Sequence, residues 1–333
     1  MQEIAIVSGI SIVIPNYNGR TLLQETLPTV IGAAEDAKLP FEIVISDDCS
    51  TDDSVPFLQQ YPHPSVKVVV NKQNKGFSPT INAGIFNSQY SHVLLLNSDV
   101  KLTPGYFNGL FRYFERPDTF GVMSKIIGWD DDKIQDGGKV SSFHGLKIKT
   151  SGNYLPVKKE EGQWYYSMYL SGANAFVDRG KLLQIGGFDE LFAPFYVEDF
   201  ELSLRAWRMG WKCYYDDFAV CRHKLSVSIK SNHKKKNVKV IYDRNKMFLH
   251  AIHLNSFKRF QWFVQLTLEG IVYLILLRSA WLRSVRSFVA HYSGVIESRR
   301  RLMKAANGRK LLSVKDVVNM VRVSVEEKEI TRF

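Results

Sequence analysis

The sequence predicts an α/β protein in which a mainly parallel sheet is followed by a helical C-terminal extension. Strand-like segments separated by long crossovers repeat four times in about the first hundred residues, which is typical of a parallel sheet with helices on both faces. The basic charge, in contrast, is concentrated late in the chain. From residue 241 onward there are 17 Lys and Arg against 7 Asp and Glu, whereas residues 1–240 hold 27 against 26. The 333 residues are enough for one large α/β domain and an extension.

Four apolar segments are the expected strands of the first half: residues 11–15, 41–46, 66–70 and 93–96. The last segment is too short for a helix and has the unbroken hydrophobicity of a central parallel strand. Between the first two strands the apolar residues follow helical spacing, so a helix is expected there. These residues are Leu22, Leu23, Leu27, Val30 and Ile31.

Polar or turn-forming side chains stand at the carboxyl ends of three of these strands: Pro15, Asn16, Tyr17 and Asn18, then Asp47 and Asp48, and then Ser98 and Asp99. Ligands of open α/β sheets bind just past these strand ends. The alternative for each acid is a helix cap or a turn. After the third strand, Lys75 and Gly76 lie in a polar loop that runs into a helix, and both the lysine and the helix N-terminus would favour a phosphate.

The second half contains two further candidate residues. Residues 121–169 read as a β-rich insertion with many turns, and residues 171–177 read as another strand. A helix is expected to begin at Glu198-Asp199 and to end at Gly210. Asp199 is either a helix-start acid, which the helix dipole favours, or a general base. The last strand is expected to end at His223, for which a structural role is the commoner alternative to a ligand role.

Taken together, these motifs resemble the family 2 glycosyltransferases over about residues 10–225. The resemblance implies the GT-A fold, with a mixed, mainly parallel sheet and flanking helices. Asn97-Ser98-Asp99 stands where the family has its DXD motif, with Asn97 in place of the first acid, and Glu198-Asp199 stands where the family has its ED motif. The implied nucleotide-binding residues are Pro15, Asn16, Tyr17, Asn18, Asp47, Asp48, Lys75, Gly76, Ser98 and Asp99.

The same resemblance implies a mechanism. Asp99 and His223 would hold Mn²⁺ or Mg²⁺, and Asp199 would act as the base. The donor would be a UDP-, dTDP- or GDP-sugar of hexosyl or rhamnosyl type, transferred with inversion. The acceptor would be a saccharide or a lipid-linked saccharide in cell-envelope polysaccharide or lipopolysaccharide assembly.

The expected organisation is a catalytic domain at residues 1–230, with a donor half at about 1–105 and an acceptor half at about 106–230, and a basic helical region at 231–333. That region begins with His233-Lys234-Lys235-Lys236. Its helices either lie on an anionic membrane surface, with Trp262 and Trp281 near the boundary, or pack on the catalytic domain.

Three cysteines without metal-ligand spacing and an N-terminus without a signal-peptide pattern predict a cytoplasmic protein, peripheral on the inner membrane if its helices bind lipid. Two other functions are weighed. A nucleic-acid-binding role for the basic region is disfavoured because the charge lies on helices rich in Trp, Leu and Ile, so no nucleic acid is expected as a partner. A non-catalytic nucleotide-sugar-binding protein is disfavoured by the intact Glu198-Asp199 pair.

Overall fold

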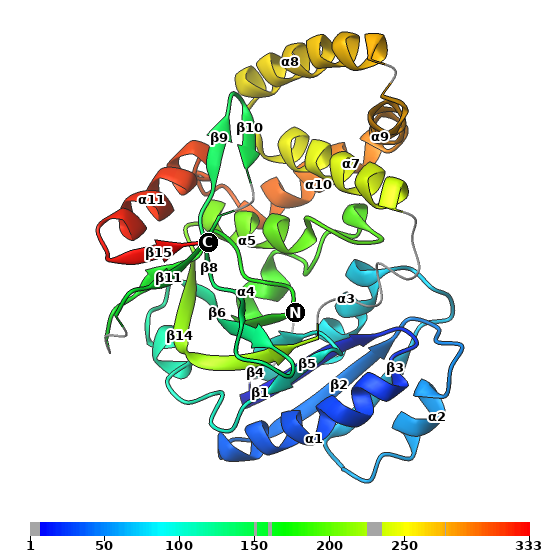
Figure 1. Ribbon diagram of the computed structural model, residues 1–333, viewed down its shortest axis with the longest axis vertical. Helices are drawn as coiled ribbons and strands as arrows, with labels where there is room; N and C mark the ends of the chain where they lie inside the picture. The colour runs from blue at the N-terminus through cyan, green and yellow to red at the C-terminus, as the bar shows by residue number, and fades with distance from the viewer. Residues whose placement is uncertain (1–6, 150–151, 159–161, 225–234, 277) are drawn as a thin grey trace.

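The centre of the computed structural model, which describes residues 7–149, 152–158, 162–224, 235–276 and 278–333, is a ten-stranded mixed sheet (Figure 1). Its order is β12-β14-β6-β13-β4-β1-β2-β3, with β5 paired to β14 and β7 paired to β6. The predicted α/β class with flanking helices and a helical C-terminal region is confirmed.

The first half supplies the parallel part of the sheet. Its elements are β1 (Val7–Asn16), α1 (Arg20–Asp36), β2 (Phe41–Asp47), α2 (Ser54–Gln59), β3 (Val66–Val70), α3 (Phe77–Asn87), β4 (Tyr90–Leu96) and β5 (Val100–Leu102). Strands β3, β2, β1 and β4 run parallel, as predicted. Both faces of β1 are buried: Ile12 and Ile14 pack with residues of α1, whereas Val13 packs with residues of α3.

The second half adds antiparallel strands and one correction. Its elements are η1 (Phe111–Glu115), β6 (Thr119–Gly128), β7 (Ile134–Asp136), β8 (Gly138–Lys139), β9 (Ser142–His144), β10 (Lys147–Lys149), β11 (Asn153–Pro156), β12 (Tyr165–Tyr166), β13 (Asn174–Asp178), α4 (Arg179–Gln184), η2 (Glu190–Phe192), α5 (Glu198–Arg208) and β14 (Lys212–His223). Residues 121–128 were assigned to an irregular insertion, but they belong to β6, which lies between β13 and β14 in the main sheet. Only the short strands after residue 128 fit the predicted insertion.

The C-terminal region is helical, as expected. It comprises α7 (Lys235–His253), α8 (Ser256–Ile275), α9 (Ser279–Ala290), α10 (Tyr292–Ala306), α11 (Val314–Glu326) and the short strand β15 (Ile330–Arg332). The expected boundary near residue 230, together with His233 and Lys234, lies outside the described residues. Within the described chain, none of the helices combines the length and hydropathy of a membrane-spanning segment.

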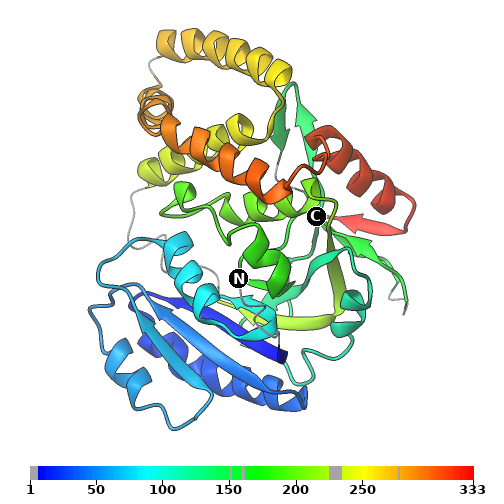
Figure 2. The same cartoon turned by 180° about the vertical axis from the view of Figure 1, so that it is seen from behind.

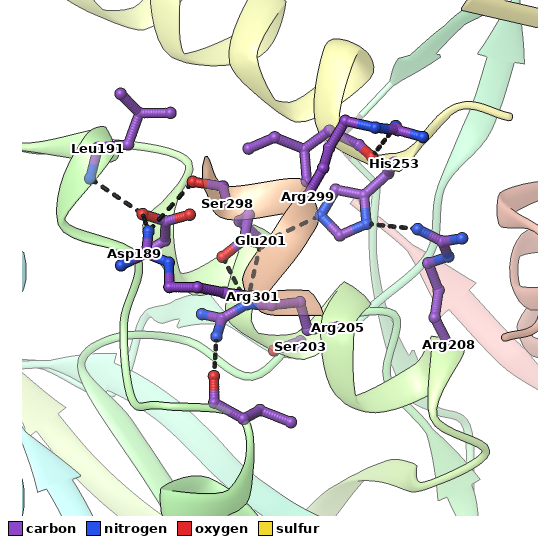
Figure 3. Close-up of polar contacts among 12 residues, drawn as sticks. Asp189, Leu191, Glu201, Ser203, Arg205, Arg208, His253, Ser298, Arg299 and Arg301 are labelled. Carbon is purple, nitrogen blue, oxygen red and sulfur yellow. Dashed lines mark hydrogen bonds and ion pairs between the residues drawn. The ribbon is translucent and has the colours of Figure 1, made fainter. Parts of the chain in front are cut away.

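A polar network, buried around Glu201 and His253, joins α7 and α10 to the rest of the protein (Figure 3). Arg208 donates to His253 Nδ1 at 3.3 Å, so the other ring nitrogen carries the proton and donates to Glu201 Oε1 at 3.1 Å. Burial lowers the pKa of His253 well below its usual value, so the ring is neutral. Arg301 of α10 pairs with Asp189 at 2.7 Å. These contacts show that α7 and α10 pack on the preceding domain.

Helix α8 packs on the protein through one side only. In the membrane-surface alternative Trp262 lies near the boundary, but its side chain is buried and stacks on His250 with a centroid distance of 5.6 Å, as the packing alternative predicts. Trp281 is half-buried against Tyr273. Both tryptophans therefore belong to the packed side of these helices.

Candidate functional site

The carboxyl end of β1 forms one wall of the candidate site. Asn16 is buried, and its amide nitrogen donates to Asp47 at 2.7 Å, whereas its Oδ1 atom is buried without a hydrogen-bond partner among the described residues. A Cβ atom at Gly19 would lie 2.3 Å from this oxygen and 3.6 Å from Ser98 Oγ. The end of β1 thus lies next to the segment after β4, and the polar atoms there leave no room for a side chain at position 19.

The two acids after β2 hold neighbouring loops. Asp47 accepts hydrogen bonds from Asn16 and from the amide and hydroxyl of Ser50. Asp48 accepts from the backbone amides of Lys75 and Gly76 at 2.9 and 2.8 Å. Both carboxylates are buried. In this conformation they fix the loops around the strand ends, and direct contact of either acid with a nucleotide stays a prediction.

Asp99 and His223 lie side by side, although they are far apart in the sequence. Strand β5 pairs with the end of β14, so that His223 faces Val100 across the ladder. His223 Nε2 lies 3.5 Å from Asp99 Oδ1. Gln135 Nε2 donates to the His223 carbonyl, so its Oε1 atom, 3.0 Å from Nδ1, accepts the hydrogen bond of the Nδ1 proton. Nε2 is therefore the ring nitrogen that faces Asp99.

This pair fits a divalent cation. Asp99 Oδ1 is a buried atom without a hydrogen-bond donor among the described residues, and burial raises the pKa of this carboxyl, against the opposing effect of His223. A carboxylate and an imidazole suit Mn²⁺. No group of three or more His, Cys, Asp or Glu that could hold a metal occurs within the described ranges. Two protein ligands match an ion that also binds substrate phosphates.

Asp199 lies in the first turn of α5, after a strained backbone. Tyr196 and Val197 have φ values of +74° and +75°, a region that L residues adopt at a cost and that is often found at functional sites. Asp199 Oδ1 accepts from the amide of Phe200 at 2.7 Å. Burial raises the pKa of Asp199, and burial together with the Asp199 charge raises the pKa of Glu198 well above its usual value. A raised carboxyl pKa suits a general base near neutral pH.

One short segment connects Asp199 with the Asp99 side of the site. The amide of Gly172 lies 3.4 Å from Asp199 Oδ2, and the carbonyl of the next residue, Ala173, accepts from the amide of Asn97 at 3.2 Å. Asn97 is two residues from Asp99. The candidate base and the candidate metal ligand are therefore held by consecutive residues of one loop.

The loop before Asp199 also contacts the donor side. The amide of Phe77 donates to the carbonyl of Pro194 at 2.9 Å. Gly76 has φ +86°, and a Cβ atom there would lie 2.8 Å from Pro194 Cα. Any larger residue at position 76 would push the two loops apart.

Helix α7 clamps the same loop from the other side. Asn245 is fully buried, and its amide nitrogen lies within 2.7–3.0 Å of three carbonyl oxygens, those of Phe192, Phe195 and Tyr196. Arg244 donates to the carbonyl of Ala193 at 2.5 Å. A helix of the C-terminal region thus fixes the backbone that leads into Asp199.

Asp199 opens into a pocket of about 480 Å³. Its lining is largely aromatic. Two of the lining residues, Tyr242 and Phe333, come from the C-terminal region. The lining residues are Lys139, Gly152, Asn153, Tyr169, Tyr196, Val197, Asp199, Phe200, Tyr242 and Phe333.

The remaining predicted residues lie at the rim. Tyr17 is exposed at 43%, Lys75 is exposed, and Pro15 is half-buried. Asn18 accepts from the amide of Thr51 and ties the first two strand ends together. Sequence reasoning missed Gln135, Asn245 and the pocket residues Lys139 and Tyr242. No local signal marked them, because each acquires its role through contacts with segments distant in the sequence.

Residues 11–174 match the family model described as Glycosyl transferase family 2. This part of the chain belongs to glycosyl transferase family 2. The chain is 39% identical over 102 residues to the undecaprenyl-phosphate 4-deoxy-4-formamido-L-arabinose transferase of Pseudomonas syringae pv. syringae (strain B728a). That match covers 29% of this chain and 30% of the relative, so it spans less than a third of the relative's length.

A longer match is to the N-acetylglucosaminyl-diphospho-decaprenol L-rhamnosyltransferase of Mycobacterium tuberculosis (strain ATCC 25618 / H37Rv). It is 24% identical over 296 residues and covers 81% of this chain and 90% of the relative. Among solved structures, GalNAc-T7 with UDP, GalNAc and Mn²⁺ matches with a TM-score of 0.61 and 18% identity, covering 76% of this chain and 49% of that one. The fold of the protein is GT-A.

Proposed function

We propose that the protein is an inverting, metal-dependent glycosyltransferase that moves a hexosyl or rhamnosyl group from a UDP-, dTDP- or GDP-sugar to a saccharide or lipid-linked saccharide. The observation that carries the proposal is the joint placement of two sites. The Asp99–His223 pair and the Asp199 carboxylate are both tied to residues 172–173. A leaving group and an attacking hydroxyl must meet at one sugar carbon, so such proximity is required.

The donor half, about residues 1–105, would bind the nucleotide at the ends of β1, β2 and β4. There, Asn16 Oδ1 would accept a hydrogen bond from the nucleotide, and the Ser98 hydroxyl would accept or donate one. Lys75 would contact the phosphates. Asp99 and His223 would hold Mn²⁺ or Mg²⁺, which supplies positive charge to the diphosphate leaving group. The relative solved with UDP and Mn²⁺ supports this assignment.

The acceptor half, about residues 106–230, would carry the base. Asp199 accepts the proton of the acceptor hydroxyl while that oxygen bonds to the anomeric carbon. The bond between this carbon and the diphosphate oxygen breaks, and the nucleoside diphosphate leaves on the opposite face. A single displacement inverts the anomeric configuration. The raised pKa of Asp199 supports its role as proton acceptor.

The acceptor would enter the pocket next to Asp199. Aromatic side chains such as Tyr169, Tyr196 and Tyr242 are suited to pack on the apolar faces of sugar rings. The two curated relatives carry undecaprenyl-phosphate and decaprenol in their names, which supports a polyprenyl-linked acceptor in cell-envelope assembly. A cytoplasmic position, peripheral on the inner membrane, belongs to the same proposal.

The test is a thermal-stability screen of the purified protein with UDP-, dTDP- and GDP-sugars, with and without Mn²⁺. One nucleotide should raise the melting temperature, and more so with Mn²⁺. The Asp99→Asn variant should lose the Mn²⁺ increment and keep part of the nucleotide effect. If no nucleotide sugar stabilises the protein, or if turnover of the selected donor in EDTA equals turnover in Mn²⁺, the donor and metal assignments are refuted.

A further inference from the structure

Helix α8 presents a continuous apolar face to solvent. Its exposed residues follow a spacing of three and four, so they lie on one side of the helix along about 30 Å. They are Phe257, Phe260, Val264, Leu268, Ile271 and Ile275, with exposed fractions of 67%, 67%, 47%, 61%, 54% and 74%. The opposite side, with Trp262 and Leu266, is buried. Soluble monomers rarely expose an apolar patch of this length, so the face is expected to have a partner.

The charges around this face are almost all positive. Residues 254–296 contain five basic residues and one acid. The acid is Glu269, which pairs with Lys147 of strand β10. The basic residues stand at both ends of the apolar face and on α9: Lys258, Arg259, Arg278, Arg283 and Arg286. The surface therefore combines an apolar stripe with a net positive border.

This combination fits the interface of an anionic lipid bilayer. Acyl chains would cover the apolar stripe, and lipid phosphates would meet the cations beside it. A second copy of the protein fits poorly, since two-fold pairing of α8 with itself would bring cations against cations at both ends. The buried Trp262 side anchors α8 to α7 and α9, so the helix would lie in the plane of the membrane.

The position of α8 agrees with such a surface. Figures 1 and 2 show α8 at the end of the molecule opposite α1 and α2, where no other element covers it from outside. The β9–β10 hairpin links it to the candidate site: the amide of Leu146 lies 3.4 Å from Gln265 Oε1 on α8, and Lys139 lines the Asp199 pocket. Lys139 and Gly145 are six positions apart, which limits the separation of their Cα atoms to about 20 Å.

We propose that α8 is a membrane-docking helix that binds anionic lipid through its apolar face and the flanking cations. Docking would place the β9–β10 hairpin, which leads to Lys139 of the Asp199 pocket, on the membrane side of the protein, where the sugar of a lipid-linked acceptor would approach. The approach of a lipid-linked acceptor to the Asp199 pocket rests on the proposed function, whereas the binding of α8 to lipid does not.

The test is flotation of the full chain with vesicles of phosphatidylcholine alone or with about one third phosphatidylglycerol. The wild type should bind the anionic vesicles and bind neutral ones at least tenfold more weakly. The double variant Phe260→Glu/Ile271→Glu should lose at least tenfold in binding to anionic vesicles, and Arg283→Gln/Arg286→Gln should lose affinity mainly at low salt. Both positions of the double variant are exposed, so folding should be preserved.

The matched control is Val323→Glu on α11, which changes a 46%-exposed apolar residue away from α8 and should bind like the wild type. Equal vesicle binding by the α8 variant and the wild type would overturn the inference. So would a wild-type dimer in sedimentation that the α8 variant converts to a monomer. Nucleotide stabilisation measured on the same samples separates the two proposals: vesicle binding without any nucleotide effect keeps the docking helix and refutes the proposed function.

Discussion

Asp199 is the residue whose surroundings most constrain the mechanism. Its carboxylate is held by the amide of Phe200, which an asparagine could also contact. We predict that Asp199→Asn keeps donor affinity and lowers transfer by roughly a hundredfold or more, the usual contribution of a general base. Calorimetry with the donor and single-turnover transfer on the same sample measure both quantities. Near wild-type transfer would remove Asp199 from the catalytic residues.

The melting temperature of Asp199→Asn should rise, whereas its transfer rate should fall. Because the folded protein raises the pKa of Asp199, the folded state binds its proton more tightly than the unfolded state does. The wild type therefore loses stability as pH rises through this pKa, and Asp199→Asn does not. We expect the variant to melt at a higher temperature than the wild type at pH 7.5, and the difference to vanish near pH 4. A lower melting temperature of the variant at pH 7.5 would indicate a purely structural helix-start role.

Gln135 illustrates what residue patterns in the sequence leave unseen. Asp99 and His223 were expected to act together from the family resemblance, and they are adjacent. Gln135, which orients the histidine, lies 88 positions before it in the short strand β7, where no sequence motif marks it. Such an orienting residue is defined only by the fold.

We predict that Gln135→Leu raises the Mn²⁺ concentration for half-maximal transfer by about 10- to 100-fold, the usual cost of losing an orienting contact to a metal-bound histidine. Nucleotide affinity without metal should stay the same. The control is the exposed Gln60, whose change to Leu should alter neither quantity. An unchanged Mn²⁺ dependence in Gln135→Leu would argue against His223 as a ligand.

At the scale of elements, α7 connects the C-terminal region to the site. The sequence predicted a helical region after the catalytic domain but left open whether it packs there. The buried Asn245 and Glu201–His253 contacts show that α7 does. The sequence placed β6 in an insertion instead of the main sheet because many turns follow it. Its neighbours in the sheet, β13 and β14, are also far away in sequence.

We predict that Asn245→Ala lowers kcat about tenfold or more while the donor dissociation constant changes little. Loss of its contacts frees the loop of residues 192–197, and small displacements of a catalytic group are costly. Asn237→Ala on the exposed side of the same helix is the control. Both variants should be assayed well below their melting temperatures. Equal losses in kcat and donor affinity would instead indicate general disruption.

For the molecule as a whole, acid should weaken the attachment of the C-terminal region. His250 of α7 accepts a hydrogen bond from the amide of Ile148 at 2.9 Å, and burial lowers its pKa from 6.5 to about 4. The unfolded state then binds more protons at this residue between these values, so the contribution of His250 to folding stability falls by roughly 3 kcal/mol as pH drops from 6.5 to 4. Urea unfolding at several pH values should show this loss, and His250→Gln should reduce it. The exposed His144→Gln is expected to leave it unchanged.

The proposed reaction requires one sugar carbon to lie between Asp199 and the leaving diphosphate. The most direct measurement is proton NMR of the product formed from the donor that the stability screen selects. Single displacement predicts that the anomeric configuration of the transferred sugar is the opposite of that in the donor, and that Asp199→Asn forms this product roughly a hundredfold or more slowly. A product that retains the donor configuration would contradict single displacement with Asp199 as the base.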